Sequence, residues 1–117
     1  MNLEMSKIIT LINEGNFQKA ELLIKNLLKS NPNSFDLNKA LAISLLGQKR
    51  YNPSLIAFNK CYELNKDDYD VNVNLSLIFN KVQDYKNSLF FSENALKKEK
   101  NRPEVYHNLA DSYLYIP

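Results

Sequence analysis

The residue types that carry out most acid–base and covalent chemistry are scarce in this chain. It contains one His, one Cys and two Gly among 117 residues. A nucleophile needs a base within hydrogen-bond reach, and neither Cys61 nor His107 belongs to a pattern that supplies such a partner. The 13 Asp and Glu residues are scattered, without a pair whose spacing suggests a general acid and base. The sequence therefore predicts no enzyme activity within these residues.

Metal and cofactor sites are not expected either. Zinc sites need clustered Cys and His ligands, and phosphate-binding loops need several glycines. We expect Cys61 to be a small buried packing residue, with a reactive thiol as the alternative. His107 is expected on a solvated surface, with contact to a ligand as the alternative. The sequence thus predicts no metal and no cofactor.

Composition limits the class of protein further. Hydrophobic residues make up 44% of the chain and charged residues 24%, which is typical of one globular domain. The net charge of +2 is too small to favour nucleic acid or an anionic membrane as the partner. Apolar stretches stay well below the ~20 residues of a membrane-spanning helix, and Glu4 and Lys7 interrupt the N-terminal apolar pattern. We expect a cytoplasmic protein without membrane insertion.

The chain repeats itself with a period of 34 residues and needs no insertion or deletion to do so. An aromatic residue recurs at each shift, and a small residue follows it three positions later. These columns are Phe17, Tyr51 and Tyr85, then Ala20, Ser54 and Ser88. Apolar columns keep the same spacing, for example Leu3, Leu37, Val71 and Val105. The repeat predicts a single domain over 1–117, made of units 1–34, 35–68 and 69–102 and a half unit 103–117.

Each unit is predicted to contain two helices, because apolar residues recur every three or four positions. The break between the two helices falls just before the aromatic column, at Gly15, Lys49 and Gln83. Ser34 and Asp68 are suitable helix N-caps. We expect Asn52 to be a cap with Pro53 at the first helical position, and Pro103 to begin the last helix. The predicted helices span 3–14, 18–30, 35–48, 52–64, 69–82, 86–99 and 103–115.

Helical pairs repeated every 34 residues resemble the tetratricopeptide repeat (TPR). The resemblance covers the whole chain and rests on the aromatic-x-x-small columns, on Leu41-Ala42 and Leu109-Ala110, and on Pro32. The aromatic residue often found early in the first helix is replaced, except at Tyr106. The resemblance implies an all-α, right-handed α-solenoid of antiparallel helical hairpins, with three TPR units and one extra helix. It also implies a concave groove, lined by the first helices, that holds a partner peptide or helix.

The groove columns predict what this surface would recognise. A column that begins at Asn2 and is acidic at Asp36, Asp70 and Glu104 forms an acidic row. It borders an apolar stripe, Ile9–Ile43–Leu77, for which ordinary core packing is the alternative. Further columns contain Met5, Lys39, Val73 and His107, and then Asn13, Gly47, Lys81 and Tyr115. The predicted groove residues are Asp36, Lys39, Ile43, Asp70, Asn74, Leu77, Lys81, Glu104, His107, Asn108 and Asp111. We expect a protein or peptide partner that is apolar with basic residues nearby.

Two recognition schemes within the family can be compared with these columns. Co-chaperones that bind the chaperone tail use a Lys and Asn clamp for a carboxylate, and here only Lys39 and Asn74 match it, so we expect no clamp. Asn74 and Asn108 resemble two rungs of the asparagine ladder in the glycosyltransferase that modifies Ser and Thr. Chance is the alternative in a chain so rich in Asn, although an amide can both donate to and accept from a peptide backbone.

The most direct interpretation is a non-catalytic scaffold or adaptor that binds a partner peptide or helix. Two alternatives remain open. One is the N-terminal recruiting arm of a larger glycosyl- or sulfotransferase, and the other is a self-association module. The last helix ends in Tyr113-Leu114-Tyr115-Ile116, a run of large apolar and aromatic side chains. We therefore expect weak homodimerisation through an edge formed by Leu109, Tyr113 and Ile116.

Overall fold

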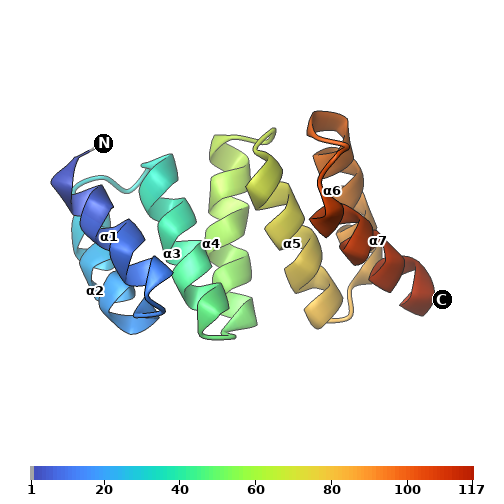
Figure 1. The fold of residues 1–117 in the computed structure, drawn as a ribbon, viewed down its shortest axis with the longest axis horizontal. Helices are drawn as coiled ribbons and strands as arrows, with labels where there is room; N and C mark the ends of the chain where they lie inside the picture. The colour runs from blue at the N-terminus through green and yellow to red at the C-terminus, as the bar shows by residue number, and fades with distance from the viewer. Residues whose placement is uncertain (1) are drawn as a thin grey trace. The chain divides into compact units, whose positions relative to one another are not determined.

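The computed structural model describes residues 2–117, which form seven α-helices and no strand (Figure 1). The helices are α1 (Leu3–Asn13), α2 (Phe17–Leu28), α3 (Phe35–Gly47), α4 (Tyr51–Leu64), α5 (Tyr69–Lys81), α6 (Tyr85–Lys98) and α7 (Pro103–Tyr115). The prediction of an all-α chain of helical hairpins is confirmed, and each helix begins and ends within two residues of its predicted position. Among residues 2–117, none of the helices is long and apolar enough to cross a bilayer.

Short polar side chains begin the helices as the sequence predicts. The Leu37 N–H donates to Ser34 Oγ at 3.2 Å, and the Val71 N–H donates to Asp68 Oδ2 at 3.0 Å. Pro103 occupies the first turn of α7. The predicted start of α4 is wrong, since Tyr51 and not Pro53 begins it. The Ser54 N–H bonds the Arg50 carbonyl at 3.0 Å, so Pro53 lies within the first turn, where its missing N–H has no helical partner to lose.

The turn inside each hairpin repeats at the level of the backbone. Gly15, Lys49 and Gln83 all have positive φ, at 78°, 58° and 65°. In each turn the N–H of the next residue donates to the carbonyl five residues before it. The Asn16 N–H, for example, donates to the Leu11 carbonyl at 2.8 Å. This is the geometry of a Schellman C-cap, which favours glycine. The predicted break points are therefore confirmed, and two of the three carry a residue that adopts this conformation at a cost.

The chain divides into two compact units, one ending at Leu64 and one beginning at Asn65. Consecutive helices form antiparallel hairpins within each unit (Figure 1). The first unit buries a cluster that includes Ile8, Ala20 and Ile24, and Cys61 is fully buried, as predicted. Glu21 is buried among these helices and accepts hydrogen bonds from Gln48 and Arg50, both at 2.9 Å.

The second unit has a more polar interior. Val71, Leu75, Ile78 and Val105 are fully buried, and four serine hydroxyls from α5, α6 and α7 form one hydrogen-bonded cluster beside them. These are Ser76, Ser88, Ser92 and Ser112. Because each hydroxyl has a partner inside the cluster, its burial avoids the cost of an unpaired polar group.

The aromatic column has the same packing role in both units. In the first unit the ring of Phe17 lies against Gly47, at a position where an added Cβ would be 2.5 Å from two ring carbons. In the second unit the ring of Tyr85 stacks on Tyr115, with centroids 5.7 Å apart. Both pairs lie 30 positions apart in the sequence. Gly47 and Tyr115, which the column pattern assigned to the groove, are instead platforms for the aromatic residue of the preceding hairpin.

Early in each first helix is a position where TPR units usually have an aromatic residue. In this chain three of the residues at that position donate hydrogen bonds to the preceding loop. Asn38 and Asn72 are buried, and their amides donate to the carbonyls of Pro32 and Lys66, each at 3.0 Å. The Tyr106 hydroxyl donates to Lys100 at 2.8 Å. In all three cases the acceptor lies six residues earlier. Asn therefore replaces the aromatic residue here without losing its link to the loop.

Candidate functional site

A pocket of about 400 Å³ opens between α1 and α3 in the first unit. It is lined by Met5, Ile9, Ile12 and Asn13 from α1, and by Asp36, Lys39, Ala40 and Ile43 from α3. Ile9 is 39% exposed and Ile43 is half-buried, so apolar surface remains accessible inside the pocket. This is the arrangement of most ligand sites, in which apolar walls are combined with a few polar groups.

Matched spacings on the two helices create the pocket. Met5, Ile9 and Ile12 follow one another by four and then three residues, and Asp36, Ala40 and Ile43 repeat this spacing on α3. Residues spaced in this way share one face of a helix. The sequence identified Ile43, Asp36 and Lys39 as site residues, but Ile12 was missed. Its spacing of three from Ile9 is the signal that could have found it.

The rim of the pocket carries both signs of charge. Asp36 is exposed, whereas Lys39 is half-buried and its ammonium lies 5.7 Å from the centroid of the Phe35 ring. A cation over an aromatic face is attracted by the ring quadrupole. The Lys39 side chain is thus drawn toward its own helix, while the Asp36 carboxylate faces solvent.

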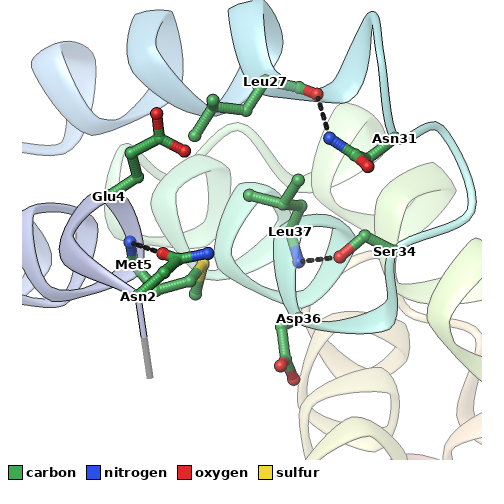
Figure 2. Close-up of a pocket in the computed structure, with 8 residues that line it drawn as sticks. All are labelled: Asn2, Glu4, Met5, Leu27, Asn31, Ser34, Asp36 and Leu37. Atoms are coloured by element: carbon green, nitrogen blue, oxygen red, sulfur yellow. Dashed lines mark hydrogen bonds between the residues drawn. The ribbon is translucent and has the colours of Figure 1, made fainter.

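A smaller hollow of about 210 Å³ lies beside the pocket, at the N-terminal ends of the same two helices (Figure 2). Most of its polar side chains are already engaged with the backbone. Asn2 accepts from the Met5 N–H at 2.8 Å, Ser34 accepts from the Leu37 N–H, and Asn31 donates to the Leu27 carbonyl at 3.3 Å. The Asp36 carboxylate points away from Glu4 in this view. Because its polar groups cap helices, this hollow is a poorer candidate than the α1–α3 pocket.

The acidic row does not continue as free carboxylates in the second unit. The Arg102 guanidinium lies 3.5 Å from an oxygen of Asp70 and 3.7 Å from one of Glu104. It also stacks on the Tyr69 ring at 4.3 Å from the centroid. Burial and the nearby Glu104 carboxylate raise the pKa of the Tyr69 hydroxyl. Asp70 and Glu104 therefore already lie near an arginine of the same chain, and their recognition of a basic partner stays a prediction.

The predicted asparagine ladder is not formed as expected. Asn108 is only 4% exposed, and its amide donates to the Val73 carbonyl at 3.1 Å. Its own carbonyl accepts from Asn80 at 3.0 Å. Asn108 therefore links α7 to α5 inside the second unit and cannot serve as an exposed rung. Asn74 is half-buried.

Three of the predicted groove residues, Asp36, Lys39 and Ile43, are brought together in the α1–α3 pocket. The other eight belong to the second unit, where Leu77 and Asp111 are half-buried while Lys81 and His107 are exposed. Across residues 2–117, no three His, Cys, Asp or Glu side chains are grouped so that they could hold a metal ion.

Comparison with known proteins identifies the fold. No protein-family profile matches the sequence, and no curated protein is significantly similar to it. Solved structures match it closely in shape at low identity. The first TPR domain of Spaghetti (RPAP3), bound to the HSP90 peptide SRMEEVD, aligns with a TM-score of 0.89 at 15% identity, over 96% of this chain and 89% of that one.

Two further structures agree with this alignment. The Sgt2 TPR domain from Aspergillus fumigatus gives a TM-score of 0.86 at 15% identity, over 97% of this chain and 76% of that chain. The MamA D159K mutant gives 0.83 at 17% identity over 95% of this chain, which spans 64% of the MamA chain. Agreement in shape at such low identity is evidence about the fold alone. The chain therefore has the all-α helical-repeat fold of tetratricopeptide-repeat domains.

Proposed function

We propose that this chain is a non-catalytic protein-interaction module, and that the α1–α3 pocket receives an apolar side chain from a segment of a partner protein. The observation that carries the proposal is the accessible apolar surface of Ile9 and Ile43 at the floor of a pocket of about 400 Å³. Apolar burial contributes roughly 25 cal/mol per Å², so one well-seated side chain supplies enough energy for weak, selective binding.

Electrostatics adds a smaller preference. The exposed Asp36 carboxylate favours a Lys or Arg beside the apolar residue of the partner, whereas Lys39 offsets part of this field. Rim charges act mainly on association rate and salt dependence. The proposed partner segment is therefore apolar first, with a basic residue nearby that matters chiefly at low ionic strength.

The fold supports a binding role by analogy. The TPR domain of Spaghetti (RPAP3) was solved with the HSP90 peptide SRMEEVD, so this architecture can bind a peptide. In the present chain, only Lys39 and Asn74 match the Lys and Asn clamp with which chaperone-binding TPR domains hold a carboxylate. We therefore expect the acidic peptide SRMEEVD to bind this chain more weakly than an apolar, basic peptide does.

The proposal can be tested with two synthetic 12-residue peptides, one built from Leu and Lys and one from Leu and Glu. Binding is measured by fluorescence anisotropy at low and high salt, and the Leu–Lys peptide is expected to bind more tightly. NMR of methyl groups should place the largest shifts at Met5, Ile9 and Ile43. Shifts confined to surfaces outside the pocket would contradict the proposed site.

A matched pair of variants distinguishes binding in the pocket from nonspecific hydrophobic binding. Ile9→Ser removes accessible apolar surface inside the pocket and should weaken the Leu–Lys peptide by about tenfold. Ile56→Ser removes a side chain that is 72% exposed outside the pocket and should leave affinity unchanged. Equal losses in both variants would refute the assignment. Asp36→Lys should weaken the Leu–Lys peptide mainly at low salt.

A further inference from the structure

The outward face of α7 carries a stripe of apolar and aromatic side chains. Tyr106, Ala110, Tyr113 and Leu114 follow one another at helical spacing, and all four are exposed, Tyr113 by 62% and Leu114 by 72%. Two residues of the predicted self-association edge, Leu109 and Ile116, are half-buried in the second unit. The exposed stripe therefore keeps Tyr113 of the predicted edge, whereas Leu109 and Ile116 offer less accessible surface.

The charge on α7 is one-sided. Residues 103–117 contain two acidic residues and no Lys or Arg. Glu104 is already engaged by Arg102 at 3.7 Å. Asp111 follows Ala110 directly and precedes Leu114 by three positions, so it borders the stripe. The α7 stripe is thus an apolar surface with an acidic margin.

A second apolar surface lies in the first unit, between α1 and α2. It is a hollow of about 440 Å³ lined by Leu3, Ser6, Lys7, Thr10, Leu11 and Leu23. The hydroxyl of Thr10 donates to the Ser6 carbonyl at 2.9 Å, and that of Ser6 donates to the Asn2 carbonyl at 3.3 Å. Because these hydroxyls are turned to their own helix, the hollow presents mainly carbon. Among the residues that line it, Lys7 alone is charged.

We propose that the α7 stripe of one copy of this chain docks in the α1–α2 hollow of a second copy. The occupant is identified by complementarity. The hollow needs an apolar ridge that brings an acidic group to Lys7, and the stripe is such a ridge with Asp111 at its margin. A hollow with a single positive charge and a helix with two acidic residues and no Lys or Arg attract each other, whereas two α7 stripes would bring two acidic margins together.

This contact joins two different surfaces, so it is head-to-tail rather than two-fold symmetric. In the dimer one copy keeps a free stripe and the other keeps a free hollow, so association can continue beyond the dimer. One helix stripe in one hollow is smaller than the ~1,200–2,000 Å² of a stable complex. The association is therefore weak, with a dissociation constant on the order of 0.1–1 mM.

Sedimentation velocity on the 117-residue chain, from about 10 µM to about 1 mM, tests the contact. A stripe-blocked variant, Tyr113→Ser/Leu114→Ser, and a hollow-blocked variant, Leu3→Ser/Lys7→Glu, alter exposed side chains and should fold normally, which circular dichroism checks. The matched control is Ile56→Ser/Lys97→Glu, with exposed positions outside both surfaces.

The expected result is concentration-dependent association of the wild type and of the control, and monomeric behaviour of each blocked variant alone. An equimolar mixture of the two blocked variants should form a dimer and nothing larger, because it retains one intact stripe and one intact hollow. Self-association of the hollow-blocked variant alone would show that stripes pair with each other and would overturn the proposal. A wild type that stays monomeric at 1 mM would overturn it as well. The α1–α3 pocket is left intact in every variant, so peptide binding is tested separately.

Discussion

Replacing Gly47 by Ala should destabilise this chain, although the same change in most helices is stabilising. Gly47 is the last residue of α3, and a Cβ placed there would lie 2.5 Å from Cε2 and Cζ of Phe17 and 2.7 Å from Cε1. Carbon atoms in contact are normally separated by about 3.5–4.0 Å. The methyl group and the ring therefore cannot keep their positions together.

Two opposing effects set the magnitude. Ala is favoured over Gly in a helix by about 1 kcal/mol, and this gain is available because Gly47 has helical geometry. Overpacking costs about 1–3 kcal/mol when side chains must leave their preferred rotamers. Phe17 must move its whole ring, since all three of the close atoms belong to the ring edge. The net expectation is a loss of up to about 2 kcal/mol in the free energy of unfolding.

A double-mutant cycle with Phe17→Ala isolates the clash. Without the ring, Gly47→Ala keeps only its helix-propensity gain and should raise the free energy of unfolding by about 0.5–1 kcal/mol. The coupling between the two sites should be about 1–3 kcal/mol. Urea denaturation followed by circular dichroism measures all four proteins. A Gly47→Ala effect with the same sign and size in both backgrounds would refute the packing of Phe17 on Gly47.

Other predictions concern the turns, the loops and pH. Lys49→Gly should stabilise the chain by about 1 kcal/mol, because φ is 58° there. Gly15→Ala, at φ 78° with open space around it, should destabilise the chain by a similar amount. Thermal denaturation measures both changes. Asn38→Ala should cost about 1–3 kcal/mol, because it removes a buried amide that donates to two loop carbonyls. Tyr106→Phe, at an exposed position, should cost less than about 1 kcal/mol. Reversed sizes would contradict the burial argument. The ammonium of its i+4 lysine and the neighbouring glutamine lower the pKa of Glu21 below 4.5. The stability that Glu21 contributes is therefore present above about pH 4.5 and is lost as pH falls through its folded pKa. Glu21→Gln should flatten the dependence of the free energy of unfolding on pH below that value. An unchanged pH dependence would refute the assignment.

Most of the backbone could be predicted from the sequence because its signals are local. Helix periodicity, the caps at Ser34 and Asp68 and the 34-residue repeat depend on residues only a few positions apart or on copies of the same pattern. The break at Lys49 was found in this way although Lys is a poor residue for positive φ. The start of α4 was misplaced because Pro is tolerated throughout the first turn and does not mark one position.

The composition of the candidate site could be predicted only in part. Helical spacing identified Asp36, Lys39 and Ile43 on one face of α3, and these residues do line the pocket with α1. The same reasoning placed Asn108 and Glu104 on the groove as free groups. In the structure, the Asn108 amide donates to the Val73 carbonyl, 35 positions earlier in the sequence. Glu104 forms an ion pair with Arg102, which Asp70 also contacts.

Local pattern decides which face of a helix is apolar and where the helix begins, since hydrogen bonds at i and i+4 and the preferences of single residues set both. It does not decide whether a polar side chain on that face meets solvent or a carbonyl from a distant helix. Asn108 lies in a column assigned to the groove, and Asn38 lies in the column that usually holds an aromatic residue. Both are buried, and the amide of each has a carbonyl acceptor within 3.1 Å. Burial of a polar group is favourable only when a partner is present, and only the tertiary structure brings that partner into place.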